Sequence, residues 1–138
     1  MHHEARADEL ARVPLFARCS KRELRRLARE SHVEQIGPGE LLVRDGAPSR
    51  QLYVILGGRA HIARRGETVD QVGVGDIVGE LGLLTDAPRN ADVLADTPLE
   101  VLSLDRAGLQ RALDEVPGLA WKLLTTVAER LHHIRPAP

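Results

Sequence analysis

Turn-forming residues divide the middle of the chain, from residue 32 to about residue 104, into short segments. Glycine, proline and aspartate mark the turns, because they readily adopt the backbone angles that reverse a chain. The runs between them are apolar or alternate in polarity, and they predict strands over 32–36, 41–44, 51–56, 59–63, 68–72, 89–95 and 99–104. Many short strands with no helices between them indicate antiparallel pairing in a sandwich or barrel. We expect a jelly-roll-like β-barrel, also described as a double-stranded β-helix, over residues 32–104.

Helical patterns precede the predicted strands. Residues 4–12 favour one or two helical turns, and Pro14 blocks their regular continuation. Ser20, with Glu23 three residues later, fits a capping box and predicts a helix over about 21–31. The helical region before the strands is therefore expected to span 4–31.

The helix expected at 21–31 carries a strongly basic run. Its cationic residues are Lys21, Arg22, Arg25, Arg26 and Arg29. Such a run is typical either of a nucleic-acid surface or of a solvated helix face. We expect a solvated face, because Glu23 and Glu30 interrupt the run and 19 Lys and Arg against 20 Asp and Glu leave the chain a net charge of -1. Direct binding of nucleic acid is not expected.

Helical patterns also follow the predicted strands, over 105–134. Asp105 is placed to cap a helix that runs to about Glu115, and Pro117 begins a longer helix that ends near Ile134. Leu119 and Leu123 lie on one side of it, where Trp121 is expected to add buried area. A second stripe, at spacings of four and three, consists of Ala120, Leu124, Val127, Leu131 and Ile134. This stripe either meets a second copy, giving a homodimer through 117–134, or is buried within the monomer.

Length and composition favour one α+β domain over residues 1–138, with 43% apolar and 28% charged residues. The single cysteine, Cys19, excludes disulfides within the chain and thiolate metal clusters, and it favours a cytoplasmic location. No apolar run approaches the roughly 20 residues of a membrane helix. No membrane segment and no metal or other cofactor are therefore expected.

The chemistry is concentrated in residues 75–93, where the strand pattern is interrupted. Glycines beside a predicted helical turn at 79–84 leave backbone N–H groups open to an anion. Alternation along 89–95 places Arg89 on the face of Ala91 and Val93, which is expected to point into the barrel. A buried guanidinium requires an anion, and its planar fork suits a phosphate. Glu80 is placed to accept hydrogen bonds from a diol.

The motif GDIVGELGLL at 75–84, followed by PRNADV at 88–93, resembles the phosphate-binding cassette of the cyclic-nucleotide-binding domain family. Further similarity lies in VPLF at 13–16, GPGE at 37–40, Gly46 and YVILGG at 53–58, so that the resemblance covers about residues 10–134. It implies a non-catalytic regulatory domain whose ligand is a cyclic nucleotide and whose C-terminal helix acts as a lid.

The resemblance also implies the roles of individual residues. Arg89 would pair with the cyclic phosphate and Glu80 with the ribose 2′-hydroxyl. The remaining expected contacts come from Val78, Gly79, Leu81, Asn90 and Ala91, with Arg130 of the last helix placed to stack on the base. Asn90 stands where the family usually has Ser, Thr or Ala, and Asp92 stands where Thr is common. Because Thr after the cassette arginine goes with cGMP preference in the family, Asn90 favours cAMP.

Other readings of these residues and of the barrel remain open. Glu80 could be a first-turn helix carboxylate, and Arg89 could pair with Asp86 or Asp92 at the surface. A barrel that has lost its ligand could serve as a docking or oligomerisation module. Similar barrels also host metal-dependent cupin enzymes, but His32 and His61 are isolated and His2, His3, His132 and His133 lie at the chain ends. We therefore expect no enzyme activity, and the effector that the domain controls stays undetermined.

Overall fold

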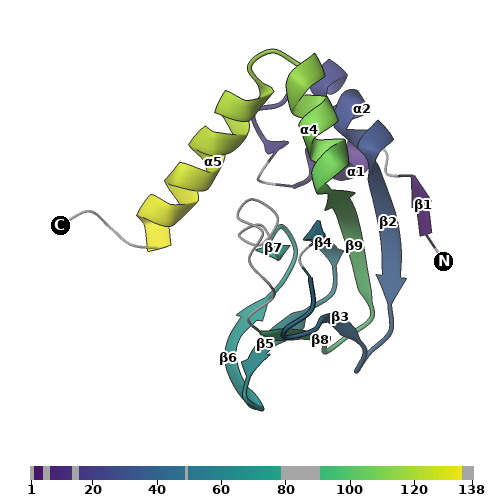
Figure 1. The fold of residues 1–138 in the computed structure, drawn as a ribbon, viewed down its shortest axis with the longest axis vertical. Coiled ribbons are helices and arrows are strands. Elements are labelled where there is room, and N and C mark those ends of the chain that lie inside the picture. Colours follow the sequence, from purple (N-terminus) through teal and green to yellow (C-terminus); the bar gives the residue numbers. More distant parts are fainter. Residues whose placement is uncertain (1, 5–6, 14–15, 49, 79–90, 135–138) are drawn as a thin grey trace.

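A computed structural model describes residues 2–4, 7–13, 16–48, 50–78 and 91–134. In chain order its elements are β1 (His2–Glu4), α1 (Ala7–Ala11), α2 (Lys21–Glu30), β2 (Ser31–Ile36), β3 (Leu41–Val43), β4 (Gln51–Gly57), β5 (Ala60–Arg64), β6 (Glu67–Val72), β7 (Ile77–Val78), β8 (Asp92–Ala95), β9 (Leu99–Asp105), α4 (Arg106–Glu115) and α5 (Leu119–Ile134). Figure 1 shows α1, α2 and α4 gathered at one end of the molecule, with β3, β5, β6 and β8 at the other.

The described strands form two antiparallel sheets. One has the order β1-β2-β9-β4-β7 and the other the order β3-β8-β5-β6. This arrangement is a β-sandwich or roll with flanking helices, and it corrects the expectation of a barrel: within the described ranges, no ladder joins the two sheets into a closed one. The alternating patterns determined the strands, but closure depends on how the sheet edges meet, which a local pattern does not encode.

The five-stranded sheet is buried on both faces. Val54 on β4 and Leu102 on β9 pack with α2, α4 and the start of α5 in one apolar cluster. Their sequence neighbours Ile55 and Val101 point to the opposite face and pack in a second cluster with β5, β7 and β8. Successive strand residues face opposite sides, so the same two strands serve both cores. The order of layers is thus helices, five-stranded sheet and four-stranded sheet.

The helix before the sheets begins as its sequence predicts. The backbone N–H of Glu23 donates to Oγ of Ser20 at 3.2 Å, and the N–H of Ser20 donates to Oε1 of Glu23 at 2.7 Å. This reciprocal pair is the predicted capping box, which is confirmed. Asp105 likewise caps α4, because its Oδ1 accepts from the N–H of Gly108 at 2.7 Å.

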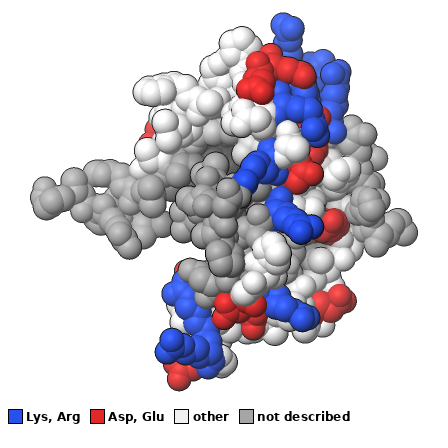
Figure 2. All heavy atoms as spheres, viewed as in Figure 1, with Lys and Arg blue, Asp and Glu red and all other residues white. Residues whose placement is uncertain are grey.

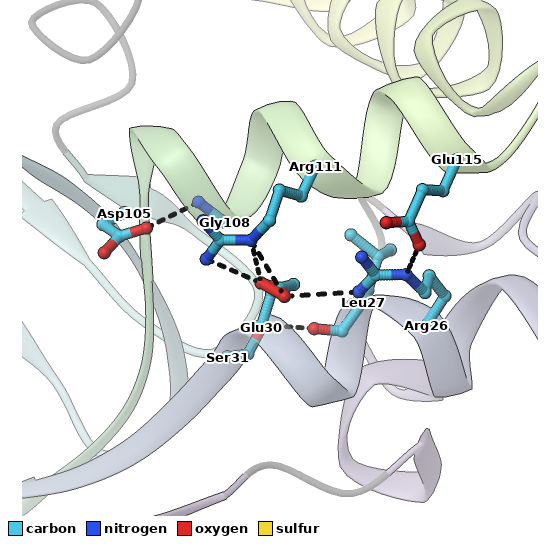
Figure 3. Close-up of polar contacts among 8 residues, drawn as sticks. All are labelled: Arg26, Leu27, Glu30, Ser31, Asp105, Gly108, Arg111 and Glu115. Atoms are coloured by element: carbon cyan, nitrogen blue, oxygen red, sulfur yellow. Dashed lines mark hydrogen bonds and ion pairs between the residues drawn. The ribbon is translucent and has the colours of Figure 1, made fainter.

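Ion pairs join α2 to α4, and one of them involves Arg26 of the basic run (Figure 3). Nε of Arg26 lies 2.6 Å from Oε2 of Glu115, and Nη1 of Arg26 lies 3.4 Å from Oε1 of Glu30. Glu30 also accepts from Nε and Nη2 of Arg111. The helix face is therefore not uniformly solvated as expected, since Arg26 and Glu30 are only 14% exposed and join two helices.

The two ends of the chain differ from their sequence-based expectation. His2–Glu4 is a strand paired antiparallel with β2, although a helical turn was expected to begin at residue 4. On α5, Trp121 is 72% exposed and Leu124 is 60% exposed. Trp121 therefore adds little buried area to the side of Leu119, and burial of Leu124 within the monomer was a wrong alternative. Helical periodicity identifies apolar stripes but not which of them finds a partner.

Candidate ligand-binding site

The segment expected to carry the chemistry connects one sheet to the other. It leaves β7, which pairs with β4 in the five-stranded sheet, and returns as β8, which lies between β3 and β5 in the four-stranded sheet. Its central residues 79–90 lie outside the described residues. The predicted contacts Gly79, Glu80, Leu81, Arg89 and Asn90 fall in that part.

The residues before the segment are fixed to β4 by a tight turn. The N–H of Gly75 donates to the carbonyl of Ile55 at 2.8 Å, and the N–H of Ile55 donates to the carbonyl of Asp76 at 3.0 Å. Oδ2 of Asp76 accepts from the N–H of Gly73 at 2.8 Å. Gly75 has a φ of 89°, in the left-handed region that glycine enters most easily. The turn directs the chain into Val78, which is buried opposite Tyr53 of β4.

The residues after the segment are fixed in the core of the roll. Ala91, Val93 and Ala95 are buried, while Asp92 and Leu94 between them are only half-buried. The prediction that Ala91 and Val93 face the interior is thus confirmed. Val78 and Val93 belong to the same apolar cluster, so both ends of the 79–90 segment enter one core.

Asp92 lies on the opposite face of β8 to Ala91 and Val93, as the alternation predicts. Its Oδ1 accepts a hydrogen bond of 2.7 Å from the backbone N–H of Asp45, in the turn after β3. The carboxylate thereby joins the first residue of β8 to the turn after β3. Asp92 stands where the family commonly has Thr, and here its side chain stabilises the turn after β3 through this hydrogen bond.

A hollow of about 420 Å³ lies between β3 and β4, and its wall includes Tyr53, which pairs with Val78. Its apolar wall includes Leu42, Val43 and Tyr53, and its cations are Arg44 and Arg50. The hydroxyl of Tyr53 donates to Oε1 of Gln51 at 2.8 Å. Such a hollow, apolar with two guanidinium groups, can accept a small ligand that has an apolar part and an anionic part. The sequence reasoning missed it, because no motif marks Arg44 and Arg50. The one available signal was a lone tyrosine in a buried strand.

The remaining predicted residues lie elsewhere. Arg130 belongs to α5, but its side chain is outside the described part. Nδ1 of His61 lies 2.6 Å from Oδ1 of Asp96, an exposed residue after β8. Among the described residues, no three His, Cys, Asp or Glu side chains gather in a way that could hold a metal ion. Within the same residues, no helix has the length and apolar character that crossing a bilayer needs.

A family model described as the cyclic nucleotide-binding domain matches residues 33–116. This chain belongs to the cyclic nucleotide-binding domain family. The match runs from the third residue of β2 to the residue after α4 and includes the segment between β7 and β8, and it confirms the resemblance seen in the motif at 75–93. The two-sheet roll described above is accordingly that of a cyclic nucleotide-binding domain.

Individual relatives agree with this assignment. A protein from Colletotrichum orbiculare named cAMP-dependent protein kinase regulatory subunit is 33% identical over 114 residues, which are 81% of this chain and 29% of that protein. This chain therefore spans less than a third of the length of that relative.

Two solved structures also match this cyclic nucleotide-binding domain. The N-terminal domain of a transcriptional regulator from Streptomyces coelicolor A3(2) has a TM-score of 0.79 and 32% identity, covering 94% of this chain and 96% of that one. A mutant form of a cAMP-binding acyltransferase from Mycobacterium smegmatis has a TM-score of 0.73 and 29% identity, covering 92% of this chain and 41% of that one. The shared region is thus one domain that occurs in proteins with different names.

Proposed function

We propose that this cyclic nucleotide-binding domain is a non-catalytic sensor that binds cAMP in preference to cGMP. The observation that carries the proposal is the burial of the residues on either side of the 79–90 segment, at the end of β7 and before β8. Within the region that the family model matches, Val78 and Ala91 fix the two ends of the 79–90 segment in the core of the roll. Because Val78 and Ala91 are already ordered in the core, a ligand that contacts them loses no entropy in fixing these two residues.

In the proposed site, Arg89 binds the cyclic phosphate and Glu80 accepts hydrogen bonds from the ribose 2′-hydroxyl. The backbone N–H groups of Gly79, Glu80 and Leu81 contribute further donors, and Asn90 offers a side-chain amide to the phosphate. The burial of Ala91 and Val93 supports this arrangement, because it confirms for these two residues the sequence alternation that assigned Arg89 to their face. The preference for cAMP rests on Asn90 in place of Thr, and the names of the Colletotrichum and Mycobacterium relatives agree with it.

We further propose that α5 closes over the bound nucleotide and that Arg130 stacks on the base. The attachment of α5 supports this movement. Leu119 at its first residue is fully buried, whereas Leu124 is 60% exposed, so the apolar packing of the described residues is concentrated at the start of the helix, and the contact farther along is the exposed ion pair of Glu129 with Arg18. Gly118 precedes it with a φ of 83° and can serve as a pivot. Ligand drives the closure only to the extent that it binds the closed state more tightly than the open state.

Isothermal titration calorimetry of nucleotide-stripped protein tests the binding proposal. We expect cAMP to bind with a Kd near or below about 1 μM, about -8 kcal/mol, and more tightly than cGMP. Arg89→Leu should abolish binding. Arg59→Leu, which removes an exposed arginine at the start of the β5 hairpin, should leave binding unchanged.

The alternative is a roll that has lost its ligand and serves for docking or oligomerisation. Absence of heat with either nucleotide, in protein that unfolds cooperatively on heating, would replace the sensor proposal by this alternative. Equal binding by wild type and Arg89→Leu would instead reject Arg89 as the phosphate ligand.

A further inference from the structure

A second hollow lies on the helical end of the molecule, away from the β7–β8 connection. It measures about 730 Å³ and is bordered by α2, the end of α4 and the first turn of α5. Its walls are Ser20, Arg22, Glu23, Arg25, Arg26, Arg29, Glu115, Val116, Pro117 and Lys122. Figure 2 shows Lys and Arg side chains gathered over this end of the molecule. The local balance is basic, although the chain as a whole carries a charge of -1.

Part of this charge is neutralised within the walls. Lys122 donates through Nζ to Oε1 of Glu23, and Arg26 pairs with Glu115. These side chains are held in place by their partners and contribute little net field to the hollow. The positive charge that remains must come from the other cations of the wall.

Three arginines of α2 supply that charge. Arg22, Arg25 and Arg29 are exposed, and none of them has a hydrogen bond or ion pair to another residue within the described part of the chain. Their spacing of three and four residues places them on one face of the helix, along roughly 10 Å of its axis. Unpaired guanidinium groups along one wall of a hollow form an anion-binding stripe, since each has a planar fork that matches a carboxylate.

The opposite wall adds an apolar surface. Val116 and Pro117 join α4 to α5 and border the same hollow. A single small anion cannot contact three arginines spread over about two helical turns and would leave this apolar wall unused. A peptide with several carboxylates and one apolar side chain uses both features, as in other Arg clusters that recognise acidic motifs.

We propose that the hollow between α2 and the α4–α5 junction docks an acidic peptide segment of a partner protein. Arg22, Arg25 and Arg29 pair with carboxylates of that segment, and Val116 and Pro117 contact its apolar residue. Charge complementarity of this kind mainly sets the choice of partner and the association rate.

A nucleic acid is the less favoured occupant. Nucleic-acid interfaces typically neutralise about six to ten phosphates, whereas this stripe has three unpaired arginines. The chain as a whole carries a net charge of -1, so no long-range field would draw a nucleic acid toward it.

Fluorescence anisotropy with a short fluorescein-labelled peptide of glutamates around one leucine tests the proposal on the full chain. We expect binding that weakens with salt, and no binding of the same peptide with glutamine in place of glutamate. The variant carrying Arg22→Glu, Arg25→Glu and Arg29→Glu should bind at least about tenfold more weakly. The matched control carries Arg59→Glu, Arg64→Glu and Arg65→Glu, which make the same change in net charge on exposed residues of the β5 hairpin and should bind as wild type.

Equal weakening in the two triple variants would overturn the proposal, because it would show that overall charge and not the hollow attracts the peptide. Absence of binding to the wild type at low salt would also overturn it. Tighter binding of a labelled single-stranded oligonucleotide than of the acidic peptide would replace it by a nucleic-acid surface. Should the triple glutamate variant fail to unfold cooperatively, the Arg22→Gln, Arg25→Gln and Arg29→Gln variant takes its place in the same comparison.

Discussion

Lys122, in the first turn of α5, donates a hydrogen bond to Glu23, in the first turn of α2. The two residues are 99 positions apart, and the Glu23 side chain is only 10% exposed. Because the same Oε1 atom accepts from the backbone N–H of Ser20, the cap of one helix is also the anchor of another. Arg18, which precedes α2, forms an exposed ion pair with Glu129, farther along α5. The orientation of α5 is thus set by contacts with Arg18 and with the first turn of α2.

The capping box leads to a prediction about stability. Replacing Ser20 by Ala removes the acceptor of the Glu23 N–H, and the free energy of unfolding should fall by about 0.5–2 kcal/mol. Urea denaturation followed by circular dichroism measures the change. Thr68→Ala, at an exposed position of β6, should stay within about 0.5 kcal/mol of wild type. A Ser20→Ala protein as stable as the control would contradict a stabilising role for the cap.

The ion pairs of Glu30 predict how stability depends on pH. Hydrogen bonds from Arg111 hold the pKa of Glu30 below its ordinary value, with a smaller opposing effect of burial and further help from Arg26. Because this folded-state pKa is lower than the unfolded one, the stabilisation is fully present above about pH 4.3 and is lost as the pH falls through the folded-state pKa.

Thermal unfolding between about pH 7 and about pH 3 tests this dependence. Glu30→Gln should be less stable than wild type at neutral pH and should lose less further stability on acidification. Glu67→Gln, an exposed position of β6, should follow the wild-type curve. Parallel curves for wild type and Glu30→Gln would show that Glu30 makes no pH-dependent contribution.

The only tryptophan of the chain reports on the proposed movement of α5. Trp121 is 72% exposed, so its emission in the free protein should be that of a solvated indole. If α5 closes over cAMP, the surroundings of Trp121 change, and the emission maximum should shift in wild type but not in Arg89→Leu. Unchanged emission in wild-type protein that binds cAMP by calorimetry would argue against movement of this turn of α5 while leaving nucleotide binding intact.

Gly58 predicts a large effect of a small substitution. It has a φ of 91°, and a Cβ atom there would overlap the carbonyl oxygen of Pro98 in the turn before β9. Gly58→Ala should therefore lower the free energy of unfolding by more than about 2 kcal/mol, since steric overlap adds to backbone strain. Gly66 has a φ of 80° but open space around its Cβ position, so Gly66→Ala should cost only about 1–2 kcal/mol. Denaturant unfolding measures the free energy of unfolding of both variants. Equal losses of stability would mean that the turn before β9 shifts away from the added Cβ at no cost.

Local patterns predicted the helices and strands well where one short-range interaction decides them. Ser20 and Asp105 cap their helices as expected, and the predicted 51–56 strand is Gln51–Gly57 in the structure. His2–Glu4 is a strand against this expectation, because its pairing with β2 across about 30 residues outweighs a weak helical preference. The prediction for Glu80 and Arg89 rests on motif and family, and it remains to be tested.

The sequence by itself determined the family, the alternation that buries Ala91 and Val93, and the caps of α2 and α4, because each depends on residues close together along the chain. Only the tertiary structure decided that two sheets form instead of a closed barrel. It also decided that Arg26 joins α2 to α4, that Arg22, Arg25 and Arg29 border a hollow, and that Trp121 stays exposed. These features depend on which surfaces meet across long sequence separations, and no local periodicity carries that information.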